Sequence, residues 1–260
     1  LKLIGADHDR LVELVPVRTV IADLDAPPID AHDVFLRLHL LSHRMVEPLT
    51  INMAGALELL QPVVWTNKGP CLADNFETVR TNLRARGLIH VYGIDRLPRM
   101  VDYVVPSGVT IAEAERVRLG AYLAERTSVM REGYVSYNAG SLGPARIEGR
   151  LSSSVVVGGG TDLSLSSALM ASRVSEFERA SMRVGRDCRL HPSAGVIGVD
   201  LGDRCEIGVN VMLEPDTMVF DVETGTQVPA RTIAGRADLR IEREPFSTSP
   251  VVRRNTLGVD

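Results

Sequence analysis

The chain has 260 residues, enough for one large domain or two smaller ones with hydrophobic cores of their own. Apolar residues make up 45% of it and aromatic residues only 4%, so Val, Leu, Ile and Ala must fill the core, which favours thin, repetitive packing. The net charge of −4 argues against nonspecific nucleic-acid binding, and no apolar run is long enough for a membrane span.

The three cysteines are Cys71, Cys188 and Cys205, and none forms a C-x-x-C pair. This sparse, odd set predicts reduced thiols rather than a disulfide framework or a zinc site. Because no signal peptide is visible either, we expect a cytoplasmic protein. The sequence begins with Leu1 rather than methionine, so we also expect further residues upstream.

A helix is predicted over residues 29–60. Its apolar residues at helical spacing are Val34, Leu38, Leu41 and Met45. Asp30 or Asp33 is the expected cap at its start. Around this helix we expect strands at 15–21, 63–66 and 89–93, and a second helix over 75–87 that ends on its glycine. This alternation predicts a small α/β domain.

From Val105 the hydrophobic period changes to six. Seventeen aliphatic residues follow this step in four runs: Val105, Ile111, Val117, Leu123, Val129 and Val135; Leu151, Val157, Leu163 and Leu169; Val184, Leu190 and Val196; Leu201, Ile207, Leu213 and Val219. The residue four positions after each is usually small, with Glu115 as the clear exception. A triangular coil explains both facts, because each hexad forms one side and its aliphatic residue points into the bore. Where the phase slips between runs, we expect loops to leave the coil.

The period is lost in the tail, where residues 251–256 (V-V-R-R-N-T) predict a short strand with paired arginines. The chain is therefore expected to be mainly β. Its expected domains are an N-terminal α/β domain over 1–104, a hexapeptide-repeat β-helix over 105–220 and a C-terminal tail over 221–260.

The clearest candidate for chemistry is Glu148, a lone acid between Ile147 and Gly149. A glycine lets a substrate approach the backbone closely, and a carboxylate there could remove a proton from an attacking amine. The alternative is an acid that is simply solvated. His191 is the only histidine in the repeat region, and it would serve the alternative of another hexapeptide acyltransferase that uses a catalytic histidine.

Three further pairs of residues were considered for other roles. Glu115 and Glu132 could bind a cation if symmetry brought copies together. Arg253 and Arg254 could meet the phosphates of a long cofactor, or form a solvated basic tail. His39 and His43, four apart on the predicted helix, are expected to be core or interface residues because they lack a zinc-protease motif.

Several longer motifs are more specific than the hexad. They are V-R-T-V-I (17–21), L-R-L-H-L-L-S-H-R (36–44), V-V-W-T-N-K-G-P-C (63–71), P-R-M-V-D-Y-V-V-P-S-G-V (98–109), Y-N-A-G-S-L-G (137–143) and E-G-R (148–150). In these motifs the chain resembles the tetrahydrodipicolinate N-succinyltransferases of the actinobacterial type, from about Val17 into the tail.

That resemblance implies a homotrimer with a left-handed parallel β-helix in each subunit. It implies an N-acyltransferase that moves a succinyl group from succinyl-CoA to tetrahydrodipicolinate, a small dicarboxylate, in the diaminopimelate route to lysine. Glu148 is the implied catalytic acid, and Glu115 and Glu132 are implied to face Mg²⁺ on the trimer axis. The residues implied to bind the donor are Arg150, Arg253, Arg254, Asn255 and Thr256.

The chain also departs from this family. Glycine-rich stretches of the family are replaced by S-L-S-S-A (164–168) and S-E-F-E (175–178), so Leu165 places a side chain where the family has backbone amides. These departures leave two alternatives open: a catalytically impaired trimer-forming paralogue, or an acyltransferase with a changed acyl donor.

Overall fold

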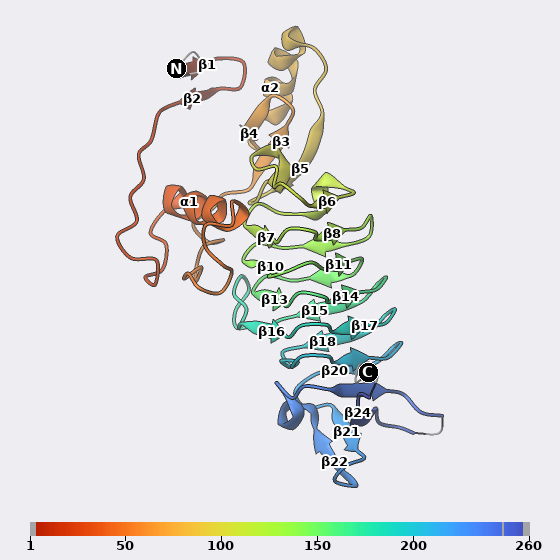
Figure 1. The fold of residues 1–260 in the computed structure, drawn as a ribbon. Coiled ribbons are helices and arrows are strands. Elements are labelled where there is room, and N and C mark those ends of the chain that lie inside the picture. Colours follow the sequence, from red (N-terminus) through yellow and green to blue (C-terminus); the bar gives the residue numbers. More distant parts are fainter. Residues whose placement is uncertain (1–3, 246, 257–260) are drawn as a thin grey trace. The chain divides into compact units, whose positions relative to one another are not determined.

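The computed structural model describes residues 4–245 and 247–256. The chain forms two compact units, one from residues 1–36 and 53–98 and the other from 37–52 and 99–260 (Figure 1). The boundary therefore lies after Pro98 rather than after residue 104, because the Met100 amide already bonds Val117 of the coil at 2.9 Å. Residues 37–52 and the tail belong to the unit that contains the coil.

The first unit contains a small antiparallel sheet with a helix packed on it. The strands are β3 (Val63–Thr66), β4 (Gly69–Leu72) and β5 (Val91–Asp95), in the order β4-β3-β5. The helix is α2 (Phe76–Leu83), followed by the 3-10 turn η1 (Arg84–Arg86). A separate hairpin pairs β1 (Gly5–Asp7) with β2 (Val12–Leu14). Residues Val64, Cys71, Phe76, Val79 and Leu83 form the core.

The positions of β3 and α2 agree with the prediction, whereas the predictions for residues 15–21 and for strands β4 and β5 were less accurate. No strand forms at 15–21, where Val17 and Val20 are exposed and find no partner strand to cover them. Strand β5 begins two residues later than predicted. Strand β4 was missed because its Gly-Pro start does not resemble a strand.

Helix α1 (Ala31–Ser42) is much shorter than the predicted 29–60. Asp30 caps its start, since its Oδ1 accepts the Asp33 amide at 2.8 Å. The helix stops because Arg44 is left-handed (φ 60°) and the amides of Arg44 and Met45 bond back to Leu41 and Leu40. Met45 consequently lies beyond the helix and is 70% exposed, so its predicted place in the helix is wrong.

The second unit is a coil of short parallel strands that form three sheets (Figure 1). The first sheet contains β7 (Ala121–Leu123), β10 (Ala139–Ser141), β13 (Val155–Val157) and β16 (Met182–Val184). The second sheet contains β9 (Tyr134–Val135), β12 (Arg150–Leu151), β15 (Ala168–Met170), β18 (Gly195–Ile197) and β20 (Met212–Leu213). The third sheet begins with β6 (Thr110–Ile111), β8 (Ser128–Val129), β11 (Arg146–Ile147), β14 (Asp162–Leu163), β17 (Arg189–Leu190) and β19 (Glu206–Ile207). Short 3-10 turns η2 (Met100–Asp102) and η3 (Ala114–Arg116) precede the regular coils.

The six-residue ladder fills the bore as predicted. Fifteen of the seventeen aliphatic residues are buried; Ile111 is half-buried in the first coil, and Val105 is 81% exposed because it precedes the first strand. The ladder does not break at Ser141, which occupies the inward position between Leu123 and Val157 and is fully buried. Its hydroxyl is satisfied there by the Thr127 hydroxyl at 2.7 Å.

The phase slips have different structural causes. After Leu169 a loop leaves the coil before Val184, as predicted. Between Ile147 and Leu151 no loop leaves the coil; the step is four residues instead of six, and the corner is shorter. The predicted loop at this position is therefore wrong.

The C-terminal tail extends the third sheet instead of standing apart. Strands β21 (Met218–Asp221), β22 (Thr226–Pro229), β23 (Leu239–Glu242) and β24 (Val251–Arg254) follow β19 in the order β23-β24-β21-β22, with the 3-10 turn η4 (Ala230–Ile233) after β22. The predicted strand at 251–256 is thus β24. It pairs antiparallel with β23, which continues the parallel ladder of β19.

Candidate active site

Glu148 lies at the short corner between β11 and β12. Ile147 pairs with Leu163 on one neighbouring coil and Val129 on the other, and Arg150 pairs with Ala168 and Tyr134. Only residues 148–149 join the two strands, whereas each neighbouring coil uses four residues for the same corner. We call this row of corners the Glu148 edge; its segments are 130–133, 148–149, 164–167, 191–194 and 208–211.

The two neighbouring corners are closed β-turns. The Gly133 amide bonds Met130 at 2.9 Å, and the Ser167 amide bonds Ser164 at 3.0 Å. Turn 130–133 carries the charged pair Arg131–Glu132 at its tip, and turn 164–167 carries Leu165–Ser166. Glu148 is thus flanked by a charged turn and by an apolar one.

Gly149 is required for this tight fit. The backbone of Glu148 bonds Leu163 and that of Arg150 bonds Ser167, both at 2.8 Å, which draws the short corner against turn 164–167. A Cβ on Gly149 would overlap the Ser167 hydroxyl and carbonyl oxygens. The sequence indicated that a substrate could approach the backbone at this glycine, whereas the structure places Ser167 of the next coil against its Cα.

The Glu148 carboxylate is held by Arg146, a residue that the sequence did not identify as a candidate for the site. Arg146 Nη2 donates to Glu148 Oε2 at 2.8 Å, and Arg146 Nη1 reaches Asp162 Oδ1 at 3.5 Å. The Glu148 side chain retains 27% of its exposure. The carboxylate is therefore oriented and still accessible to a ligand, with Oε1 outside the Arg146 hydrogen bond.

Arg150 emerges from the same corner on β12. Its guanidinium lies over the Tyr134 ring of the previous coil, 4.3 Å from the ring centre. This contact fixes a positive charge two residues from Glu148, because a cation over an aromatic face is attracted to it. Tyr134 gave no signal in the sequence beyond its place in the repeat.

A row of charged side chains connects the Glu148 region to the tail. Strand pairing places Arg146, Asp162, Arg189, Glu206, Arg240 and Arg253 in register across the third sheet. With about 4.8 Å between strands, the five steps from Arg146 to Arg253 span roughly 24 Å. Arg253 is already paired with Glu244, whereas Arg254 and Thr256 are exposed.

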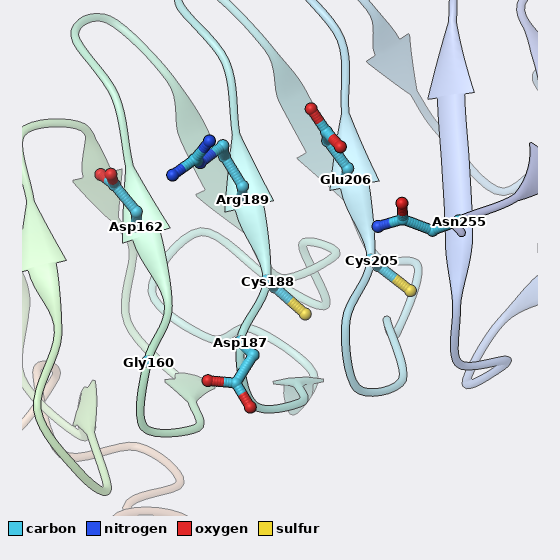
Figure 2. A pocket seen from close by; sticks show the side chains of 8 residues that line it. All are labelled: Gly160, Asp162, Asp187, Cys188, Arg189, Cys205, Glu206 and Asn255. Atoms are coloured by element: carbon cyan, nitrogen blue, oxygen red, sulfur yellow. The ribbon is translucent and has the colours of Figure 1, made fainter. Parts of the chain in front are cut away.

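A pocket of about 280 Å³ lies along this row (Figure 2). Asp162, Arg189 and Glu206 line it from the strands, and Asn255 closes it from the tail. Asn255 is anchored by its amide to Asp238 at 2.7 Å and by its side chain to Arg204 at 3.0 Å. Of the predicted donor residues, Asn255 is thus the one that the pocket includes.

His191 lies on the outer surface of the third sheet beside this pocket. Its Nε2 is 2.5 Å from Glu206 Oε1. Strand register places His191 two strands from Glu148 in the same outward row, with Ser164 between them. At two strand spacings, about 10 Å, His191 is too far away to share a proton with Glu148.

Cys188 and Cys205 also border the pocket, but their thiols donate hydrogen bonds to backbone carbonyl oxygens within the same unit. Cys188 Sγ donates to the Gly202 carbonyl at 3.1 Å, and Cys205 Sγ donates to that of Arg236 at 3.2 Å. The adjacent Cys205 thiol and burial raise the pKa of Cys188. Free and buried, these cysteines are packing residues, as the sequence indicated.

The two acids predicted to face a metal lie on the coils before Glu148. Glu115 is exposed in η3, and Glu132 is 3.8 Å from Arg116 at the tip of turn 130–133. Within the described residues of one chain, no group of three or more His, Cys, Asp or Glu side chains is placed to hold a metal ion. A single chain therefore supplies carboxylates here without completing a metal site.

His39 and His43 stack on one another, with ring centres 5.9 Å apart, and the Tyr103 ring meets His39 edge-on. Burial and the neighbouring His43 lower the pKa of His39. His39 is thus partly buried among ring contacts, whereas His43 is exposed and does not occupy a core position.

Comparison with known proteins identifies the family of the chain. A family model described as "Tetrahydrodipicolinate N-succinyltransferase middle" matches residues 60–99. The chain is 39% identical over 249 residues to the 2,3,4,5-tetrahydropyridine-2,6-dicarboxylate N-succinyltransferase of Pseudomonas aeruginosa, an alignment that covers 94% of this chain and 72% of that protein. The chain belongs to the tetrahydrodipicolinate N-succinyltransferase family.

Other members of this transferase family agree with the assignment. The Pseudomonas putida protein of the same name is 40% identical over 236 residues, covering 89% of this chain and 68% of the relative. A solved structure described as a 2,3,4,5-tetrahydropyridine-2-carboxylate N-succinyltransferase from Campylobacter jejuni superposes with a TM-score of 0.80 at 26% identity. The match covers 89% of this chain and 64% of that one, so the chain spans less than two thirds of the solved protein. No helix among the described residues has the length and apolarity that crossing a membrane requires.

Proposed function

We propose that this chain transfers a succinyl group from succinyl-CoA to tetrahydrodipicolinate, in the diaminopimelate route to lysine. The acceptor is a cyclic imine, and water adds to its C=N bond to give the hydrated or ring-opened form, whose amine takes the succinyl group. The observation that carries the proposal is the placement of Glu148. Its carboxylate is oriented by Arg146, accessible, and located at the corner where the backbone of the coil recedes.

Glu148 acts as the general base in this proposal. The amine nitrogen attacks the thioester carbonyl, a C–N bond forms, and the C–S bond breaks. The nitrogen gives its proton to Glu148 Oε1, and sulfur leaves as a thiolate that takes up a proton to give free CoA. Arg146 keeps Oε2 occupied, so the carboxylate is held in one orientation throughout.

The charged row on the third sheet suits a long anionic donor. Arg254, Asn255 and Thr256 would bind its phosphates at the tail, together with Arg253 once it leaves Glu244. Arg150, fixed over Tyr134, would lie near the thioester end. The roughly 24 Å between Arg146 and Arg253 then corresponds to the length of the pantetheine arm and its phosphates.

We also infer a left-handed coil and a homotrimer, on the strength of family membership. In such a trimer Glu115 and Glu132 would face their copies around the axis, and six carboxylates would give Mg²⁺ the oxygen ligands it prefers. The ion would hold the subunits together; the acyl transfer described above does not need it. A cytoplasmic location is consistent with a soluble biosynthetic substrate and product.

The intact Glu148 corner favours an active transferase over an impaired paralogue. A thiol-release assay with succinyl-CoA and tetrahydrodipicolinate tests the proposal directly. We expect CoA release that depends on both substrates. Absence of release with succinyl-CoA, together with absence of calorimetric binding of the acceptor or of CoA, would reject it.

A further inference from the structure

The turn Ser164–Ser167 is the part of the coil that a donor meets just before Glu148. This turn follows β14, and β14 lies between β11 and the strands that lead to the tail. A donor held at Arg253 and Asn255 must therefore pass this turn to bring its thioester to Glu148. Leu165 lies at the tip of the turn and is 46% exposed.

The turn holds Leu165 rigidly. The Ser167 amide and hydroxyl both bond the Ser164 carbonyl, at 3.0 and 2.7 Å, and the Ser193 amide bonds the Leu165 carbonyl at 3.1 Å. Ser166 adopts the left-handed conformation (φ 60°) that closes the turn. The exposed leucine is thus fixed by backbone contacts on both sides, and a ligand that covers it gains apolar burial at little ordering cost.

The two sides of Glu148 differ in chemistry. On the far side the tip of turn 130–133 carries Arg131, whose positive charge suits a dicarboxylate acceptor. On the donor side the tip carries Leu165 and Ser166, which suits methylene groups. The structure therefore separates a polar acceptor side from an apolar donor side across one short corner.

We propose that Leu165 is a specificity-determining residue of the acyl site, which contacts the methylene chain of the acyl group whose carbonyl lies at Glu148. This inference rests on the proposed acyl transfer. It predicts that the enzyme prefers thioesters whose acyl group carries methylenes, as butyryl and succinyl groups do, over the acetyl group, which has none.

Val209 provides a matched control. It occupies the same position as Leu165 in the turn 208–211, two coils farther along the Glu148 edge, and it is 53% exposed. Truncation of either residue removes exposed apolar surface from an equivalent turn. Strand pairing places turn 164–167 on the coil next to the Glu148 corner, whereas turn 208–211 lies two coils farther away, so only truncation of Leu165 should change acyl selectivity.

The experiment measures calorimetric binding of CoA, acetyl-CoA, butyryl-CoA and succinyl-CoA to wild type, Leu165→Ala and Val209→Ala without acceptor. We expect Leu165→Ala to lower the preference for butyryl-CoA over acetyl-CoA by about fourfold, the contribution of one buried methylene. Succinyl-CoA should weaken similarly, CoA itself should bind equally well, and Val209→Ala should match the wild type. Thermal melting of the three proteins verifies that they fold alike.

An unchanged butyryl-to-acetyl preference in Leu165→Ala would overturn the inference. So would an equal loss in Val209→Ala, or acyl-CoAs that bind wild type no more tightly than CoA. Turnover is measured separately on the wild type with acceptor present. If acyl-dependent binding changes as expected but no CoA is released, the proposed transfer fails while the Leu165 contact stands.

Discussion

Replacing Gly149 with alanine tests whether the short corner is held as tightly as the structure indicates. The added methyl would overlap the hydroxyl and carbonyl oxygens of Ser167 and lie 3.0 Å from its carbonyl carbon. The rigid backbone of turn 164–167 cannot rotate away, so the two coils must separate locally. Separation of the coils lengthens the 2.8 Å hydrogen bond from the Arg150 amide to Ser167.

The expected cost follows from these two effects. Overpacking costs roughly 1–3 kcal/mol and a lost backbone hydrogen bond about 1 kcal/mol, so Gly149→Ala should destabilise the protein by about 2–4 kcal/mol. At about 3 °C per kcal/mol for a chain of this size, the melting temperature should fall by roughly 6–12 °C. Circular dichroism during thermal unfolding measures this shift.

Gly93→Ala is the control for the chemical change itself, because no atom lies within 4 Å of the position that its new methyl group would take and its φ is not positive. This variant should melt close to the wild type. If Gly149→Ala also melts like the wild type, the close contact between the short corner and Ser167 does not exist in solution. Acyl transfer should fall in Gly149→Ala as well, because displacement of the corner moves Glu148.

Three further perturbations test other parts of the structure. Ile147→Ala should lower the free energy of unfolding in urea by about 2–5 kcal/mol, because Ile147 is fully buried in the bore. Met45 is 70% exposed, so Met45→Ala should change this free energy by no more than about 0.5 kcal/mol. Equal effects of the two substitutions would contradict the assigned ladder. Asp30→Ala should cost about 1 kcal/mol through loss of the cap of α1, and an unchanged unfolding midpoint would show that the cap is not formed. The hydrogen bond from Arg236 lowers the pKa of Asp221 below its ordinary 3.8, so its ionised form stabilises the folded state above that pH and the stabilisation is lost as the pH falls through the lowered value. Asp221→Asn should therefore be less stable than wild type at neutral pH, with a difference that shrinks in acid; a pH-independent difference in urea unfolding would refute the ion pair.

The ladder could be predicted because each coil repeats one physical requirement, an inward aliphatic residue every six positions. The same rule could not locate the short corner, because a four-residue step from Ile147 to Leu151 and an excursion of the chain produce the same loss of phase. Ser141 was a second difficulty. A serine in the bore resembles a break in the sequence, and only the structure shows Thr127 satisfying its hydroxyl.

The N-terminal region was less predictable because its elements depend on contacts between distant residues. Helical spacing continues to Met45, but the helix ends because Arg44 adopts a left-handed conformation. This conformation could not be predicted, since arginine is not typical of it. The apolar residues at 15–21 resemble a strand, yet a strand needs a neighbour, and in the described part of the chain none pairs with them.

The candidate site was predicted in part. Glu148 and Gly149 carry local signals, an isolated acid beside a glycine. Arg146 and the Tyr134–Arg150 contact carry none, because each results from stacking of residues on different coils. The sequence also could not indicate a role for Leu165, because only strand pairing shows that its turn lies next to the short corner with Glu148.

The central claim is that Glu148 performs the proton transfer of an acyl transfer. The most direct test compares kcat for succinyl-CoA and tetrahydrodipicolinate in wild type, Glu148→Gln and Glu125→Gln, the last an exposed acid on another corner of the same coil unit. We expect Glu148→Gln to lose about 10²–10⁴-fold in kcat with little change in donor binding, and Glu125→Gln to retain wild-type kcat. A Glu148→Gln enzyme that turns over as fast as the wild type would contradict the account.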